Sequence, residues 1–331
     1  MSTVGFKEYV VKRTINLVAV VVIVIILNFF LFRILPGNPA TFLISPGMTL
    51  EAREAMLRLW GLDKPLHEQF LTYLANMLTG NLGISFSSTK PVAVELMERL
   101  PNTILLLGSA TVLYMILGIA LGVVAVSRRG SRTDLFSVGA ALFTQAIPVF
   151  FLGLLLLLMF GYYLPVATNG AISFPLAGTI SRPPPKDQLA YVLDVVWHLA
   201  LPLTTLVVIN FGGYVLIIRN LMIDALSQDY ITTAKAKGLD ERTILYRHGL
   251  RSILPPVVTM VGLSLAGVVG GAVITETIFT WFGVGRYLYD AVLGYDYPVM
   301  QGTFFFLAVI TIVANYIVDL IYGLLDPRIK Y

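Results

Sequence analysis

Long apolar runs separated by polar segments are the feature that most limits how this chain can fold. A helix needs about 20 apolar residues to cross the hydrocarbon core of a bilayer, and the sequence repeatedly reaches that length. Backbone polar groups in lipid must pair within the protein, which favours helices, and the alternating pattern of membrane β-strands is absent. We therefore predict an all-α membrane protein with six transmembrane helices. They lie at residues 15–35, 103–126, 137–163, 199–222, 257–279 and 303–325.

Composition supports this prediction and excludes several kinds of site. Of 331 residues, 57% are hydrophobic and 13% are charged, which is about half the charged share of a soluble domain. The sequence has no cysteine, so disulfides and thiolate metal sites are excluded. The three histidines, His67, His198 and His248, are scattered along the chain, and we predict no metal centre from them.

The distribution of basic residues predicts the orientation of the helices. If the N-terminus is cytoplasmic, most of the 23 Lys and Arg residues fall in inside segments, as the positive-inside rule requires. Both termini are then cytoplasmic in a multi-pass protein of the cell (inner) membrane. The first apolar run, preceded by Lys7, Lys12 and Arg13, is longer than a signal-peptide core and is predicted to be retained.

The largest segment predicted to lie outside, residues 36–100, has the pattern of a small helical extracytoplasmic cap. Thr49 is an N-cap for a helix that Gly61 ends, and Pro65 begins a second helix that stops at Gly80. The chain is accordingly divided into three parts. They are an N-terminal segment with the first transmembrane helix (1–35), the cap (36–100) and a core with five transmembrane helices (101–331).

One segment of the predicted core is polar, basic and helix-prone. We call residues 224–256 the polar loop. Its residues 230–237 favour a helix that Gly238 ends in a left-handed cap, and Asp240 caps a second short helix that runs to about Arg247. Such a loop at the membrane surface indicates a soluble partner that docks there. The same pattern is also typical of an amphipathic helix resting on anionic lipid.

Several motifs resemble the B-type permease subunits of dipeptide and oligopeptide ABC importers. In the polar loop, DYITTAKAKGL is similar to the cytoplasmic "EAA" loop of ABC-importer permeases, with Thr232-Thr233-Ala234 standing where the general motif has Glu-Ala-Ala. The absent glutamate and the late Leu254-Pro255 pair both resemble the peptide-permease variant. Further similar segments cover nearly the whole chain. They are LPGNPA (35–40), GLDKPLHEQF (61–70), GNLGISF (80–86), RLPNT (99–103), TETIFTWFGVGR (275–286), DYPVMQG (296–302) and DLIYGLLDPRI (319–329).

This resemblance implies a non-catalytic permease subunit of an ATP-binding-cassette importer that carries short peptides. The implied partners are a second homologous permease, two ABC ATPase subunits, an extracytoplasmic solute-binding protein and the lipid bilayer, with no nucleic acid. The chain has no GxxxxGK[ST] phosphate loop, so ATP hydrolysis belongs to partner chains and no cofactor is expected in this one. The resemblance assigns ATPase contact to the polar loop. The residues are Tyr230, Thr233, Ala234, Lys235, Ala236, Gly238, Leu239, Asp240 and Arg247.

Four polar residues in the predicted helices are candidates for the translocation path or its gate. They are Asn210, Glu276, Asn315 and Asp319. An ionisable group in a membrane helix is by default a functional candidate. The structural alternatives are that Asp319 pairs with Arg328 or Arg219, and that Glu276 ends its helix.

Two further patterns concern the shape and packing of the helices. Pro148 predicts a kink in the third transmembrane helix, because proline removes a backbone donor and crowds the preceding turn. Gly118 and Gly122 form a GxxxG pair, which predicts close packing against a neighbouring helix.

The sequence is also compatible with other substrates and other kinds of membrane protein. The same architecture serves for oligosaccharides or nickel chelates, and Trp60, Trp197 and Trp281 suit sugars as well as they suit membrane-interface anchoring. A free-standing secondary carrier usually has internal repeats and broken, charged helices at mid-membrane, and neither is evident in the sequence. An intramembrane enzyme needs a nucleophile, base or metal set, which the predicted helices lack.

Overall fold

The computed structural model describes residues 6–34, 49, 51, 54, 63–268 and 272–325. These residues are predominantly helical, and their only extended pairing is an isolated bridge between Ile84 and Pro91, which confirms the all-α class for this part of the chain. The chain divides into two compact units. The first comprises Met1–Pro101 and Gly283–Tyr331, and the second comprises Asn102–Phe282.

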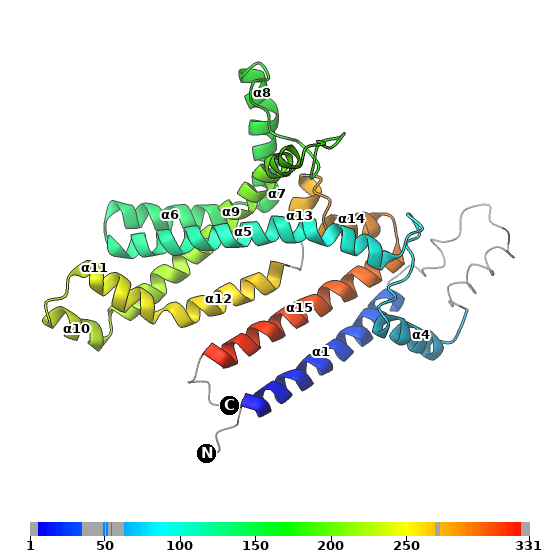
Figure 1. Ribbon diagram of the computed structural model, residues 1–331, viewed down its shortest axis with the longest axis horizontal. Coiled ribbons are helices and arrows are strands. Elements are labelled where there is room, and N and C mark those ends of the chain that lie inside the picture. The colour runs from blue at the N-terminus through cyan, green and yellow to red at the C-terminus, as the bar shows by residue number, and fades with distance from the viewer. Residues whose placement is uncertain are drawn as a thin grey trace. The chain divides into compact units, whose positions relative to one another are not determined.

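The first unit contains two long helices that run side by side (Figure 1). They are α1 (Phe6–Ile34) and α15 (Tyr297–Leu325). Two shorter helices, α4 (Leu66–Leu78) and α14 (Val284–Leu293), pack against α1 and α15 respectively. The core of this unit includes Phe29, Tyr73 and Val299. Within it, the side-chain amide of Asn28 donates to the Tyr73 hydroxyl at 2.8 Å, so a polar group of α1 is paired with α4.

The second unit contains three long helices that approach closely at glycines. They are α5 (Val92–Ser127, of which the part after Pro101 belongs here), α6 (Arg132–Ala146) and α9 (Gln188–Leu226). Gly118 of α5 lies against Tyr214 of α9, and a Cβ atom at Gly122 would lie 2.8 Å from the Cβ of Ile218. Only glycine permits this approach, so the packing role predicted for the GxxxG pair is confirmed.

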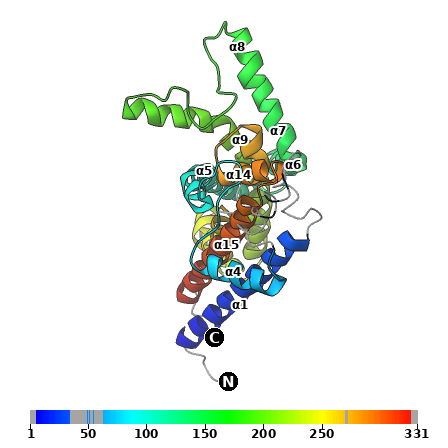
Figure 2. The same cartoon turned by 90° about the vertical axis from the view of Figure 1, so that its right-hand side faces the viewer.

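The prediction of one helix over residues 137–163 is wrong. The chain instead ends α6 at Ala146 and continues as α7 (Val149–Leu156), the π-helix η1 (Leu157–Tyr163) and α8 (Leu164–Ala167). These last three form one continuous rod (Figure 2). Ile147 and Pro148 are extended, with ψ angles of 124° and 136°. Proline disfavours a helical conformation in the residue before it, so Pro148 separates two helices instead of kinking one.

Among the described residues, five helices are long and apolar enough to cross a membrane. They lie at Glu8–Arg33, Val92–Ser127, Val149–Ala167, Gln188–Leu226 and Tyr297–Leu320. The predicted helix at 257–279 corresponds to α12 (Leu254–Gly267) and α13 (Val273–Ile278). Residues 269–271 between them lie outside the described residues, so the sixth transmembrane helix stays a prediction.

The predicted cap is described in part. The helix α4 follows Pro65 as expected, and Gly80 has a φ angle of 74°, the left-handed conformation that glycine adopts without strain. Tyr73 and Met77 are buried on its inner face. The helix predicted between Thr49 and Gly61 lies, apart from single positions, outside the described residues.

Candidate functional site

The polar loop folds as two short helical segments joined by a glycine turn. The helix α10 (Asp229–Ala236) stops just before Gly238, whose φ angle is 74°. Asp240 then accepts a hydrogen bond from the backbone N–H of Thr243 at 3.1 Å, and hydrogen bonding from Thr243 lowers the pKa of Asp240. The chain continues through α11 (Glu241–Thr243) and the π-helix η2 (Ile244–Leu250). The predicted helix, glycine turn and capped helix are confirmed.

A small apolar core holds the two segments together. Ile231 and Ala234 of α10 are buried with Ile244 of η2, and Leu226 packs against them. A Cβ atom at Gly249 would lie 3.0 Å from Leu226 of α9, so η2 also packs against the end of that long helix. Ala234 therefore uses its small side chain inside the loop. Its neighbours within the described part of the chain belong to the loop itself, and its assignment to ATPase contact stays a prediction.

The outer surface of the polar loop carries exposed charged side chains. Apart from Ala234, the residues assigned to ATPase contact are exposed. Within the described part of the chain, none of Lys235, Lys237, Arg242 and Arg247 has an ion-pair partner. A hollow of about 420 Å³ opens on this surface. It is lined by Asp240, Arg242, Thr243, Tyr246 and Arg247. The loop thus presents exposed cations and an exposed tyrosine around a concave surface, which suits docking of a protein partner.

Two of the sequence motifs meet in the second unit. From RLPNT, the Asn102 side chain donates to the Phe282 carbonyl oxygen at 2.8 Å, and Trp281 Nε1 donates to the Asn102 carbonyl oxygen at 2.9 Å. The Thr103 hydroxyl donates to the Glu276 carboxylate at 2.9 Å. Trp281 and Glu276, both from TETIFTWFGVGR, are fully buried. These hydrogen bonds therefore connect the first residues of this unit to its last residues.

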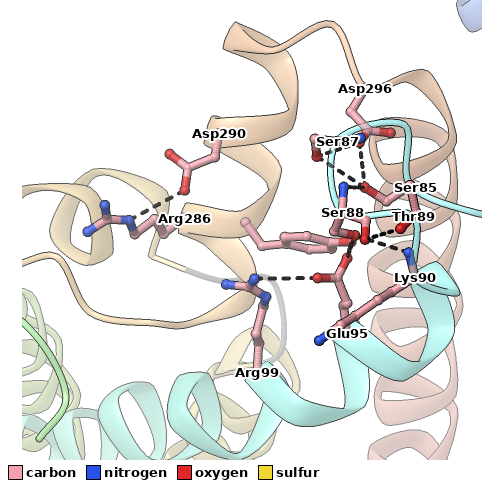
Figure 3. Close-up of polar contacts among 11 residues, drawn as sticks. Ser85, Ser87, Ser88, Thr89, Lys90, Glu95, Arg99, Arg286, Asp290 and Asp296 are labelled. Carbon is pink, nitrogen blue, oxygen red and sulfur yellow. Dashed lines mark hydrogen bonds and ion pairs between the residues drawn. The ribbon is translucent and has the colours of Figure 1, made fainter.

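Two other motifs meet in a cluster of the first unit that we call the buried polar network (Figure 3). Its members are Ser85, Ser87, Ser88, Glu95, Arg99, Tyr287 and Asp296. Asp296 is 2% exposed. It accepts hydrogen bonds from the Ser85 hydroxyl at 2.6 Å, the Ser87 hydroxyl at 2.9 Å and the Ser87 backbone N–H at 3.0 Å. GNLGISF, which contains Ser85, is thereby tied to DYPVMQG, which begins with Asp296 at the start of α15.

Glu95 is the second carboxylate of the buried polar network. It accepts hydrogen bonds from the Tyr287 hydroxyl at 2.6 Å and the Ser88 hydroxyl at 2.9 Å. The Arg99 guanidinium lies 4.4 Å from the centre of the Tyr287 ring, a cation–π contact. Burial and the bond to Glu95 raise the pKa of Tyr287, so its hydroxyl stays a donor. Glu95 and Tyr287 were not identified from the sequence, where a lone glutamate at a helix start is the only signal.

Two of the four path or gate candidates bond other residues of the same chain. Glu276 bonds Thr103, as described above, and sits within α13 where it has no exposed surface. Asp319 pairs with Arg13 of α1 at 2.9 Å. Of the two partners considered for Asp319, Arg219 bonds Asp134 instead, and Arg328 lies outside the described residues.

The other two candidates, Asn210 of α9 and Asn315 of α15, are exposed. Asn210 uses one side-chain N–H in a bond to the Leu206 carbonyl oxygen of its own helix at 2.7 Å. Exposed amides in membrane-spanning helices need a polar partner that hydrocarbon does not provide. These residues therefore remain candidates for a surface that water, substrate or another subunit reaches.

Arg219 has a different partner, which the sequence did not indicate. Its guanidinium bonds both oxygens of Asp134, at 2.7 and 2.9 Å. The Gly130 backbone N–H also donates to Asp134 at 3.0 Å. The bond from Arg219 is the largest cause that lowers the pKa of Asp134 to about 2. This bidentate pair ties the start of α6 to α9, where the loop between α5 and α6 meets the helix that leads into the polar loop.

Comparisons with known proteins agree with the motifs. The family of binding-protein-dependent transport system inner membrane components matches residues 115–331, and the N-terminal part of such membrane components matches residues 6–107. The oligopeptide transport system permease protein AppB of Bacillus subtilis is 35% identical over 98% of this chain and 99% of its own length.

Two further relatives carry dipeptide names. The di/tripeptide transport system permease protein DppB of Pseudomonas aeruginosa is 35% identical over 93% of this chain and 94% of its own length. The dipeptide transport system permease protein DppB of Escherichia coli is 33% identical over 98% of this chain and 99% of its own length. With apolar helices long enough to span a membrane, this chain belongs to the family of binding-protein-dependent transport system inner membrane components, among the dipeptide and oligopeptide permease subunits of ABC importers.

Proposed function

We propose that this chain forms the translocation path for short peptides together with a second homologous permease. Two separate ATPase subunits drive transport, and an extracytoplasmic binding protein delivers the substrate. The observation that carries the peptide assignment is similarity over nearly the full length to permeases named for oligopeptides, di/tripeptides and dipeptides, at 33% to 35% identity. Because similarity extends through the N-terminal and C-terminal parts alike, it concerns the whole subunit.

The proposed orientation places both termini and the polar loop in the cytoplasm, with six transmembrane helices and the cap outside. The distribution of Lys and Arg supports it. Arg128, Arg129 and Arg132 fall on the same side as the basic residues of the polar loop in this arrangement, and all three are exposed. Asp134, the acidic group nearest to them in sequence, is occupied by Arg219.

The polar loop is the proposed coupling element, which docks in a groove of one ATPase subunit. Its exposed cations, its hollow and its internal apolar core support this role. The core makes the loop a rigid body, so a push from the ATPase moves it as a unit. The contact of Gly249 with Leu226 then passes that movement to α9. ATP binding closes the ATPases and opens the path outward, and hydrolysis resets it.

The path and gate residues are proposed on different grounds. Asn210 and Asn315, which are exposed on their helices, are proposed to line the path. Glu276 and Asp319, which bond Thr103 and Arg13 within the chain, are proposed to hold helix ends whose positions define the gate. A carboxylate that already bonds a neighbouring side chain holds its helix in position. We therefore do not expect it to contact the substrate.

Purification of the assembled complex tests this proposal. This chain is co-expressed with its genomic neighbours, and ATPase activity is measured with the purified binding protein and with di- to pentapeptides. We expect an ATPase and a second permease to co-purify, and peptides to stimulate hydrolysis. Stimulation by oligosaccharides or nickel chelates alone would keep the architecture and overturn the peptide assignment. If no ATPase co-purifies, the coupling role of the polar loop is wrong and a free-standing carrier becomes the better hypothesis.

The glycine turn offers a sharper test of coupling. Gly238 has a positive φ angle and no atom within 4 Å of an added Cβ, so a substitution there strains the backbone without a steric clash. We expect Gly238→Val to uncouple ATP hydrolysis from transport, because β-branched residues strongly disfavour this conformation. Gly238→Asn is the matched control, since asparagine tolerates it. Equal transport by the Val and Asn variants would contradict the rigid-lever mechanism.

A further inference from the structure

A groove of about 300 Å³ lies within the second unit. Three helices line it: α5, α9 and α12. The polar lining residues are Thr111, Tyr114, Asn210 and Ser264, and the others are aliphatic residues and one glycine. No ionisable carboxylate or amine is among them. This volume is at the lower end of the range of small-molecule sites, about 300–1,000 Å³, and holds part of a small solute.

Polar groups converge on this groove from all three helices. Thr111 and Tyr114 come from the middle of α5, Asn210 from the middle of α9, and Ser264 from α12. The Ser264 hydroxyl is hydrogen-bonded to the hydroxyl of Tyr214, whose ring lies 5.3 Å from that of Tyr114. The groove is therefore amphipathic, and contacts with Tyr214 hold the Ser264 and Tyr114 side chains in place on its polar side.

Asn210 is a residue of the groove with hydrogen-bonding capacity to spare. One of its side-chain N–H groups bonds its own helix at Leu206. Within the described part of the chain, its carbonyl oxygen has no bond and its side chain is exposed. An unpaired amide group loses its hydrogen bonds to water when hydrocarbon covers it, so lipid tails are a poor occupant of this surface. A polar occupant fits it.

We propose that this groove is a peptide-contact site on the translocation path, in which Asn210 hydrogen-bonds the main chain of the passing substrate. The inference rests on the proposed function and adds the site and the chemical group recognised. A side-chain amide offers one donor and one acceptor, which is the complement of a peptide unit. The neutral lining favours main-chain recognition over selection of charged side chains. Tyr114 and the apolar residues accommodate side chains of varied size.

Accessibility of an introduced cysteine tests the site in the assembled complex. The chain has no native cysteine, so Asn210→Cys places a single thiol in it, and labelling is read from the mass of this chain alone. The reagent is a water-soluble, membrane-impermeant maleimide, and the substrate probe is trialanine with its binding protein. The matched control is Ile116→Cys on α5, which is 58% exposed but outside the groove.

We expect the thiol at position 210 to be labelled and trialanine to protect it during turnover, while the thiol at position 116 is not labelled because lipid covers it. Labelling at 210 that trialanine does not change would overturn the inference. No labelling at 210 in any nucleotide state would also overturn it, since the residue would then face lipid or the second permease.

Transport kinetics provide a second readout that a purely structural residue would not alter in the same way. We expect Asn210→Leu to raise the KM for trialanine transport about two- to tenfold, the effect of one lost neutral hydrogen bond, with a smaller fall in the maximal rate. Asn210→Gln should restore part of the KM. If the wild-type complex transports trialanine and the Leu variant keeps its KM, the site is wrong. If the wild-type complex transports no peptide, the proposed function itself fails, and this inference with it.

Discussion

The buried polar network and the polar loop both contain many charged and hydroxyl groups, but they use them in opposite ways. In the network, the Asp296 and Glu95 carboxylates are almost completely buried and saturated by donors of the same unit. In the polar loop, Lys235 and Arg247 are exposed and lack an ion-pair partner among the described residues. A buried charge must be satisfied within the fold, so the network holds structure. Uncommitted exposed charge is available to a partner.

Removal of Asp296 should produce the largest effect. Asp296→Ala leaves the Ser85 and Ser87 hydroxyls and the Ser87 N–H without their acceptor, at a cost of about 3 kcal/mol or more. We expect the Tm of the purified chain in detergent to fall by several degrees. Asp290→Ala is the control, because Asp290 is 56% exposed and its one ion pair among the described residues is with the neighbouring Arg286, at 3.5 Å. An equal fall in Tm for the two variants would show that the buried carboxylate stabilises the fold no more than the exposed one.

The Asp134–Arg219 pair should give the next largest effect, and its pH dependence can be predicted. The pKa of Asp134 is lowered to about 2 from an ordinary value of 3.8, so the pair stabilises the folded state above about pH 4 and is lost as the pH falls toward 2. We expect the pair to stabilise the folded state at neutral pH by on the order of 2 kcal/mol. Asp134→Asn should lower the Tm by the same amount at pH 7 and at pH 5. The control is Glu98→Gln, an exposed carboxylate.

A difference between wild type and Asp134→Asn that shrinks between pH 7 and pH 5 would contradict the lowered pKa. It would mean that the carboxylate already takes up a proton in this range. A constant difference combined with no effect of Glu98→Gln would support the bidentate pair as the cause.

Within the polar loop, a larger side chain should destabilise the fold more at a buried position than at an exposed one. Ala234→Leu overfills the space between Ile231 and Ile244 and should cost about 1–3 kcal/mol. Ala236→Leu is matched in chemistry and lies on the exposed side of the same helix. We expect protease cleavage of the loop in the purified chain to rise for the first variant and not for the second. Cleavage at equal rates would show that the apolar core does not hold α10 against η2.

The surface cations should have the smallest effect on stability and a clear effect on assembly. Arg247→Ala removes no ion pair of the described residues and should change the free energy of unfolding by less than about 0.5 kcal/mol. Co-purification of the ATPase subunit should nevertheless fall, most strongly at high ionic strength, because exposed charges act between partners and are screened by salt. A large loss of Tm with unchanged ATPase recovery would reverse the contrast between the two regions.

The fold class and the form of the polar loop could be predicted from local sequence patterns. The apolar runs predicted the all-α class, and Gly238 with the Asp240 cap predicted the two-helix form of the polar loop. These features depend on neighbours in sequence. The third helix was predicted wrongly because a hydropathy pattern does not distinguish one helix from two, and the extended conformation before Pro148 separated α6 from α7.

Side-chain partners could not be predicted in the same way. Asp319 and Arg219 are both near the ends of apolar helices, which suggested that they pair, yet they bond Arg13 and Asp134 respectively. The resemblance assigned Ala234 to ATPase contact, and nothing in the sequence indicated that it packs with Ile231 and Ile244 inside the loop. Opposite charges and small residues occur at several places in the chain, and their patterns do not say which of them become neighbours.

The sequence by itself determined that this is a helical membrane protein with a basic, helix-forming loop, and its motifs determined the family. Hydrophobicity, glycine conformation and helix capping act over a few residues and can be read directly. Only the tertiary structure decided that Ser85 meets Asp296, that Thr103 meets Glu276, and that Asn210 opens into a groove. Such contacts join residues that are far apart in the chain, because the helices bring them together when they pack their apolar faces and pair their buried polar groups.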